Sequence, residues 1–291
     1  MKLKKVVKVL LSCVMAGALF TGCGGGEQPA QKADDANKSG GKIQLGMITH
    51  LNASEQKMND ILSKIEESEK VPLIKHTVKF YDSLNLMQMG IESGSIDEIS
   101  VYKSVANYIV ANNNKYEALN QKEHTTIFND NFCFAVRKDD TALKADLDKA
   151  IEEMKSDGSL DNLVKEYVTD VDAGQTPTAV ELPMTEGADT IKVGVTGDLP
   201  PLDYVNADGK AAGFNTALLA EVAKRSEKNI EIVDIESGAR AAALSSGQID
   251  VIFWAIVPNG DKMPKDIDTP ENVELSAPYF SDSVEHLQIK K

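Results

Sequence analysis

The stretch Ile191 to Gly197, IKVGVTG, is a short run rich in Val that ends in turn-forming residues, the pattern of a buried strand leading into a helix. Residues 42–49, KIQLGMIT, repeat this pattern in the other half of the chain. Each run is followed by a predicted helix end, a Ser-Gly stop and an Ile-Asp pair that opens an apolar strand, in 87–99 and 241–252. The sequence therefore predicts two α/β units of similar design.

Two further segments lie between these units. Residues 141–168 carry apolar side chains at helical spacing, interrupted at Asp157-Gly158, and this predicts two consecutive amphipathic helices. Residues 170–189 combine prolines, glycines and acidic residues without periodicity, which is typical of an exposed connector.

The amino end has the features of a signal peptide. Four lysines within Met1 to Lys8 precede an apolar run, Val9 to Phe20, that is too short to span a membrane. The run ends in LFTGC, which resembles the bacterial lipobox, and this implies that the thiol of Cys23 is lipidated. An ordinary secretory signal with an incidental cysteine is the alternative. Residues 24–42 are rich in Gly, Ala, Lys and Asp and predict a flexible tether, with acyl chains such as palmitate as the anchor.

Composition limits the possible partners and the internal chemistry. About 250 residues remain to fold, a length that suits two lobes better than one core. The net charge of −14 becomes −18 without the four signal-peptide lysines, so nucleic acid is an unfavourable partner. Once Cys13 is cleaved off and Cys23 is acylated, only Cys133 remains, in the apolar run NFCFAV, where we expect a buried, unreactive thiol.

Several segments resemble the family 3 solute-binding proteins of ABC transporters. Residues 191–222 look like that family's opening strand, Pro-Pro turn, hairpin and first helix, and 244–253 and 275–280 resemble the segments that follow in the same lobe. Residues 132–167 look like the family's final strand and terminal helices. The resemblance implies a two-lobed periplasmic-binding-protein fold of type II, an α/β fold. It also implies a small solute captured by lobe closure and an ABC permease as partner.

The order of these segments differs from the family's order, because the part resembling the family's end precedes the part resembling its beginning. We therefore expect a circular permutant that is a monomer; two truncated domains that complete each other between chains are the alternative. The predicted organisation is a signal peptide (1–22), a tether (23–42), a lobe resembling the family's second lobe (43–136), helices completing the first lobe (137–169), a linker (170–189), the main part of the first lobe (190–280) and an inter-lobe crossing strand (281–291).

Candidate ligand-binding residues lie where strands end, since ligands of open α/β sheets settle at the carboxyl ends of strands. Thr49, Asn52 and Ser54 follow one strand and can bind a ligand carboxylate, or Asn52 or Ser54 can simply cap a helix. By the resemblance, Asp198 and Leu199 border the cleft from the other lobe. Asp198 can pair with an ammonium group or cap its turn.

Two more candidates belong to the second unit. Trp254 stands where the family places a cleft-lining residue and is expected to be a stacking platform, with core packing as the alternative. Arg240 can meet a carboxylate bidentately, with a solvated surface arginine as the alternative.

Two anchors of the family's amino-acid binders are missing. Residues 255–262 contain no arginine for the ligand α-carboxylate, and Lys262 is a weak substitute. Tyr102 stands where the family usually has an aspartate for the α-ammonium group. The solute is therefore expected to be an unusual amino acid held by Arg240 and Asp198, or not an α-amino acid at all.

The sequence predicts a binder rather than an enzyme. It has no nucleophile elbow, phosphate loop or paired-cysteine site, and we expect no cofactor and no catalytic residue. A dehydratase on the same fold and a sensory or partner-binding lipoprotein are the alternatives. Histidines without metal-ligand spacing predict no metal site and surface or hinge positions for all four of them: His50, His76, His124 and His286.

Overall fold

The computed structural model describes residues 41–68, 75–119, 128–170 and 175–290. The predicted signal peptide, Cys23 and most of the tether lie outside the described residues. The helices and strands, in chain order, are β1 (Ile43–Ile48), α1 (Glu55–Ser68), β2 (His76–Tyr81), α2 (Leu84–Glu92), β3 (Glu98–Tyr102), α3 (Lys103–Asn112), β4 (Tyr116–Ala118), β5 (Asn129–Arg137), α4 (Thr141–Asp157), α5 (Ser159–Val164), a π-helical turn (Lys165–Thr169), β6 (Thr190–Val195), β7 (Asp198–Leu199), β8 (Asp203–Val205), β9 (Ala211–Ala212), α6 (Phe214–Ser226), β10 (Asn229–Asp234), a 3-10 turn (Ser237–Ala239), α7 (Arg240–Ser246), β11 (Val251–Pro258), β12 (Val273–Leu275) and β13 (Phe280–Ile289).

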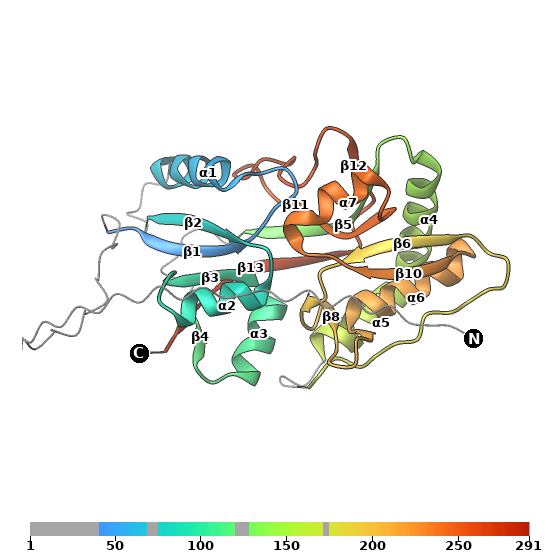
Figure 1. Ribbon diagram of the computed structural model, residues 1–291, viewed down its shortest axis with the longest axis horizontal. Helices are drawn as coiled ribbons and strands as arrows, with labels where there is room; N and C mark the ends of the chain where they lie inside the picture. The colour runs from blue at the N-terminus through green and yellow to red at the C-terminus, as the bar shows by residue number, and fades with distance from the viewer. Residues whose placement is uncertain (1–40, 69–74, 120–127, 171–174, 291) are drawn as a thin grey trace, which may run out of the picture. The chain divides into compact units, whose positions relative to one another are not determined.

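The main sheet runs in the order β10-β6-β11-β5-β13-β3-β1-β2 and has two parallel halves (Figure 1). In one half, here the β1 lobe, β1 pairs in parallel with β2 and β3. In the other half, the β6 lobe, β6 pairs in parallel with β10 and β11. Figure 1 shows α1 on one side of β1 and β2, with α2 and α3 on the other. The predicted α/β class and two similar units are confirmed.

Two long strands connect the lobes. The first part of β13 pairs antiparallel with β5, with Phe280 opposite Phe132, and its later part pairs with β3, with His286 opposite Ser100. On its other side β5 pairs with β11 of the β6 lobe. Among the described residues the last strand thus shares a lobe with the first, because β1 and β13 both pair with β3.

In both lobes an isoleucine side chain packs closely against a glycine of the first strand. A Cβ atom added at Gly46 of β1 would lie 2.5 Å from Cδ1 of Ile96, and one added at Gly194 of β6 would lie 2.6 Å from Cδ1 of Ile249. Both isoleucines directly precede the aspartate of the Ile-Asp pairs noted in the sequence. Each glycine therefore leaves room for the isoleucine side chain that packs against the first strand of its lobe.

The helices over 141–168 form as predicted. Helix α4 ends at Gly158, whose φ of 77° is a left-handed conformation that favours glycine, and α5 begins at the next residue. Both helices pack against α6 of the β6 lobe, and Arg225 of α6 donates to Asp157 at 2.8 Å. Cys133 is 2% exposed, and burial raises its pKa to about 12, as expected for an unreactive core thiol.

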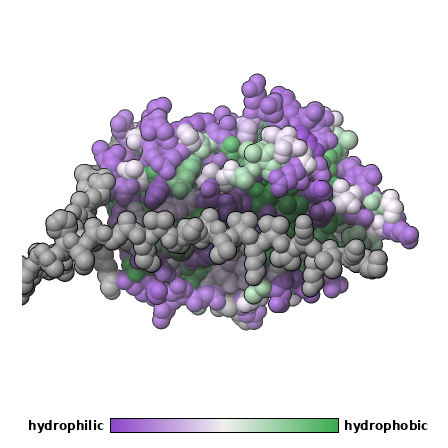
Figure 2. Space-filling view, viewed as in Figure 1, coloured by the Kyte–Doolittle hydropathy of each residue, from purple (hydrophilic) through white to green (hydrophobic). Residues whose placement is uncertain are grey.

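The described surface is hydrophilic over most of the face drawn in Figure 2, in keeping with the charge of −14. The described part of the connector, 175–189, contains no helix, and its Ala179 forms an isolated bridge with Ala212 of β9. Each helix among the described residues is too short or too polar to cross a bilayer.

Candidate functional site

The segment that follows β1 contacts the β6 lobe directly. The carbonyl of Thr49 accepts a hydrogen bond from Nη2 of Arg240 at 3.0 Å, and the amide of Asn52 donates to the carbonyl of Ile267 at 3.0 Å. The side-chain amide of Asn52 also donates to two carbonyls within residues 266–269, at 2.8 and 3.1 Å. The two lobes are therefore closed against each other at the ends of their strands.

Arg240 lies at the centre of this contact. It is 1% exposed, and its guanidinium lies 3.9 Å from the ring centroid of Trp254. Nη1 donates to the carbonyl of Trp254 at 2.8 Å, and Nε donates to the carbonyl of Ser237 at 3.1 Å. Burial lowers the pKa of Arg240, opposed chiefly by the charge of Asp268. The alternative of a solvated surface arginine is wrong, because Arg240 is enclosed and hydrogen-bonded to both lobes.

Asp268 joins the same elements with a buried carboxylate. It is fully buried; Oδ1 accepts from the amide of Leu51 at 2.7 Å and lies 3.1 Å from Nδ1 of His50, while Oδ2 accepts from the amide of Ile256 at 3.0 Å. Burial raises the pKa of Asp268, but His50 and the charge of Arg240 outweigh it, so the net pKa lies below its usual value. A negative charge is therefore held between the lobes.

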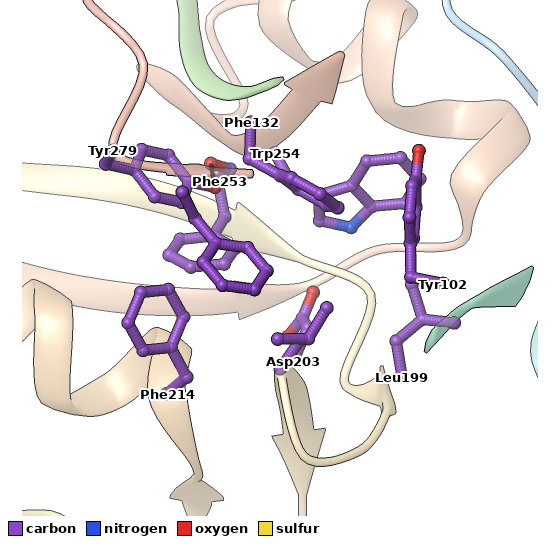
Figure 3. Close-up of a pocket in the computed structure, with 10 residues that line it drawn as sticks. Tyr102, Phe132, Leu199, Asp203, Phe214, Phe253, Trp254 and Tyr279 are labelled. Carbon is purple, nitrogen blue, oxygen red and sulfur yellow. Dashed lines mark hydrogen bonds between the residues drawn. The ribbon is translucent and has the colours of Figure 1, made fainter. Parts of the chain in front are cut away.

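Aromatic rings from both lobes line a small cavity next to Trp254 (Figure 3). Its volume, about 10 Å³, has room for roughly one water molecule. The cavity is lined by Tyr102, Phe132, Leu199, Leu202, Asp203, Phe214, Phe253, Trp254, Tyr279 and Phe280. The rings stand close to one another, with centroids 4.6 Å apart for Tyr102 and Phe132 and 6.5 Å apart for Phe132 and Trp254. Flat apolar surface thus surrounds few polar atoms, as in many small-molecule sites.

Tyr102 comes from the end of β3 in the β1 lobe and is paired with a carboxylate. Its hydroxyl donates to Asp130 of β5 at 3.0 Å. Burial raises the pKa of Asp130 to about 6, although the Tyr102 hydroxyl favours its charged form. A carboxylate from β5 thus lies within hydrogen-bond distance of the Tyr102 hydroxyl.

Asp198 and Leu199 form β7 on the edge of the β6 lobe. Oδ2 of Asp198 accepts from the amide of Leu84, the first residue of α2, at 2.5 Å. Burial raises the pKa of Asp198 to about 6, and the neighbouring Asp203 adds to that effect. Leu199 is 7% exposed and lines the aromatic cavity. Asp198 therefore caps a helix of the opposite lobe rather than only its own turn.

The remaining candidates, Thr49, Ser54 and Asn52, have different kinds of partner. The hydroxyl of Thr49 donates to Asp82 Oδ1 at 2.8 Å. Ser54 accepts from the amide of Lys57 at 3.1 Å and so caps the start of α1, which is one of its two predicted roles. Asn52 instead donates to the β6 lobe, as described above. The structure brings Thr49, Arg240 and Trp254 together and leaves Ser54 at the exposed helix start.

Sequence reasoning missed the buried acids. Asp268, Asp130 and Asp203 were not among the candidate residues, although each is at most 5% exposed. Asp203 accepts from the amide and hydroxyl of Thr196 at 2.8 and 2.9 Å and from Asn215 at 2.6 Å. The available signal was an acidic residue in an apolar setting, as in PPLDY, but that pattern alone does not identify a partner.

The histidines were predicted to be surface or hinge residues, and the three that the structure describes are partly buried. The side chains of His50, His76 and His286 are 9%, 12% and 20% exposed. Each lies near a carboxylate from a distant part of the sequence, which spacing along the chain does not reveal. His124 lies outside the described residues.

Two α/β lobes joined by paired strands, with polar and aromatic groups of both lobes meeting at their strand ends, define a protein of the two-lobed periplasmic-binding-protein class. The model of the bacterial extracellular solute-binding proteins, family 3, matches residues 92–170 and 191–287, more than half of the chain. The chain belongs to this family. The resemblance seen in the sequence is confirmed, and the family is extracellular by its description.

Single proteins match this chain either over a short stretch or at low sequence identity. A "Probable histidine-binding protein" of Campylobacter jejuni is 31% identical over 103 residues, which cover 35% of this chain and 36% of that protein, so the match spans about a third of the curated relative. Among solved structures, the methionine-binding protein MetQ is 12% identical with a TM-score of 0.41, covering 86% of this chain and 84% of that one. Peb3 from Campylobacter jejuni is 11% identical with a TM-score of 0.40, covering 86% and 87%.

Proposed function

We propose that this protein is the extracytoplasmic solute-binding component of an ABC importer, which captures a small polar solute by closing its two lobes. The observation that carries this proposal is the set of direct bonds between the lobes around Arg240, which links Thr49 of the β1 lobe to Trp254 of the β6 lobe. A solute that binds better to the closed arrangement shifts the population toward it. The closed form then offers both lobes to a permease.

The chemistry of the site suits a small amino-acid-like solute or another small organic acid. Arg240 donates to the backbone carbonyl groups of Ser237, Trp254 and Thr49, which uses three of its five N–H groups. The two remaining N–H groups can donate to a carboxylate of the solute. Asp130 accepts from Tyr102 and Asp198 precedes Leu199, both of which line the aromatic cavity, so acidic oxygens lie one residue away from the cavity wall and favour an ammonium group or a protonated ring. Histidine, named for the Campylobacter jejuni relative, belongs among the first solutes to test.

A screen of amino acids and small organic acids by thermal shift tests the proposal. We expect at least one solute to raise Tm, and the sole tryptophan, Trp254, to report the binding by a change in its emission. Trp254→Phe should weaken solute affinity roughly 5- to 30-fold by calorimetry, because a smaller ring loses stacking worth about 1–2 kcal/mol.

Phe134→Leu is the matched control. Phe134 is fully buried against Tyr279 but is not among the lining residues of the cavity, so this variant should lose stability and keep solute affinity. Equal affinity losses in the two variants would remove Trp254 from the binding site. If no solute of either class binds, the proposed transport function is wrong.

A sensory or partner-binding lipoprotein is the second candidate function. Direct bonds between the lobes and a cavity of about 10 Å³ favour it, because the protein's own side chains fill the space between the strand ends. The same screen separates the two functions, since a partner-binding protein shows no rise in Tm with any small solute.

We also propose that the chain is lipidated at Cys23 and circularly permuted. The lipobox-like LFTGC supports the anchor. The permuted order is supported by α4 and α5, which pack on α6 of the β6 lobe although they precede it in the chain. In this arrangement 170–189 joins the old ends.

Cys23→Ser is expected to move the protein from the membrane fraction to the soluble fraction, because no acyl chain remains to hold it. Light scattering of the released protein should give the mass of one chain. Unchanged membrane association would contradict the lipid anchor, and an obligate dimer would contradict the permuted monomer.

A further inference from the structure

Three side chains that carry metal-ligating atoms meet on the β1 lobe: His76 of β2, Glu98 of β3 and His286 of β13. One ligand atom from each lies within 4.8 Å of the other two. Oε2 of Glu98 is 3.1 Å from Nδ1 of His286 and 3.7 Å from Nε2 of His76. The two imidazole rings stand edge to face, with centroids 5.5 Å apart.

The sheet register explains why these residues meet. His286 lies opposite Ser100, two residues from Glu98, and antiparallel partners point to the same face, as do alternate residues of a strand. On β1, Ile43 pairs with His76 and Leu45 pairs with Glu98, so these two side chains also share that face. The cluster is therefore a product of strand order, which places residues from both ends of the folded chain together.

A fourth residue, Glu66, contacts the ring and the backbone of His76. Oε1 of Glu66, from α1, lies 3.5 Å from Nδ1 of His76 and accepts from the amide of His76 at 2.8 Å. The side chains of Glu66 and Glu98 are only 10% and 5% exposed. Two largely buried carboxylates thus face two imidazoles, an arrangement that favours added positive charge.

We propose that Nε2 of His76, a carboxylate oxygen of Glu98 and Nδ1 of His286 bind a divalent transition metal ion, with zinc as the best fit. Zinc takes nitrogen and oxygen ligands at about 2.0–2.2 Å, and two such ligands of a tetrahedral site are then about 3.4 Å apart. The observed separations of 3.1 and 3.7 Å bracket that value. Glu66 orients the His76 ring through Nδ1, as carboxylates do behind metal-bound histidines.

The site is separate from the proposed solute site and has a structural consequence. Ile43, which pairs with His76, begins β1, whereas Thr49 follows its end, so the two sites are about 20 Å apart along the strand. A metal ion here ties the last strand of the chain, β13, to β2 and β3. Metal binding should therefore stabilise the β1 lobe whether or not a solute is bound.

Titration of tag-free, chelator-treated full-length protein with zinc chloride in a calorimeter tests this proposal. We expect one zinc ion per chain and a rise in Tm with zinc. His286→Gln and Glu98→Gln should weaken zinc binding by about 100-fold or more, and Glu66→Gln by about 10- to 100-fold. Far-UV circular dichroism confirms that each variant is folded, and cobalt(II) bound to the unaltered protein should show the visible bands of a site with imidazole ligands.

His50→Gln is the matched control, because it removes a histidine–carboxylate pair of similar burial from another part of the molecule. It should keep the zinc affinity of the unaltered protein. The proposal is overturned if the unaltered protein binds no zinc. It is equally overturned if His286→Gln and Glu98→Gln bind zinc as tightly as the control, since the ion then sits elsewhere.

Discussion

Arg240→Ala is expected to abolish solute binding and to lower the free energy of unfolding by about 3–5 kcal/mol, since removing one member of a buried charge network costs this much. Three carbonyl groups, of Ser237, Trp254 and Thr49, lose their donor together. The buried carboxylate of Asp268 loses the charge of Arg240, and Trp254 loses its stacking partner. Urea unfolding measures the stability, and calorimetry with the solute found in the screen measures the affinity.

Two further variants make this prediction specific. Arg240→Lys keeps the charge but lacks the planar fork, so it should recover part of the stability and little of the affinity. Arg225→Ala removes an arginine of α6 that bonds Asp157 and Ser159 near the surface, and it should keep solute affinity with a much smaller loss of stability. An Arg240→Ala protein as stable as Arg225→Ala would show that the buried guanidinium does not hold the lobes together.

The features of the fold that depend on neighbouring residues were accessible from the sequence. Gly158 with the apolar spacing of 141–168 predicted α4, its end and α5, and the runs 42–49 and 191–197 predicted β1 and β6. These patterns arise from periodic burial, which the local sequence records directly. The two-unit design followed because the strand pattern and the later Ile-Asp pair occur once in each half of the chain.

The polar contacts of the site depend instead on long-range pairing. Asp268 meets His50 and Leu51, more than 200 positions away, only because the lobes close. Arg240 looked equally compatible with solvent, since the run of small residues around it does not show what covers it. Spacing rules found no metal ligands for the same reason, because His76, Glu98 and His286 are assembled by strand order rather than by a motif.

Ser54 shows the opposite case, in which the local interpretation held. Its hydroxyl caps α1 through Lys57, three residues on, and a short-range contact of this kind is one that a sequence pattern can specify. The neighbouring Asn52 is also a residue that can cap a helix, but its side chain bonds the opposite lobe. A capping residue and a lobe-bridging residue therefore look alike until the fold supplies the partner.

Asp268→Asn is expected to lower the free energy of unfolding by about 3 kcal/mol at pH 7. Asp268 accepts hydrogen bonds from the amides of Leu51 and Ile256 on its two oxygens, so an asparagine must place an NH₂ group against one of these donors. The variant also leaves Arg240 without the charge of this neighbour. Urea unfolding of both proteins gives the difference.

The pH dependence of this difference follows from the lowered pKa of Asp268 in the folded protein. A carboxyl with a depressed folded pKa stabilises the fold above its unfolded pKa, about 3.9, and this contribution is lost as pH falls through the folded pKa. The stability gap between Asp268→Asn and the unaltered protein should thus stay constant from pH 8 to about pH 5 and narrow only below about pH 4.

Asp266→Asn is the matched control. The side chain of Asp266 is 63% exposed, so this variant should change the free energy of unfolding by less than about 0.5 kcal/mol at every pH. If the two asparagine variants are equally stable, the carboxylate of Asp268 does not couple the lobes, and closure must rest on Arg240 and the other bonds between the lobes, such as those of Asn52 and Asp198.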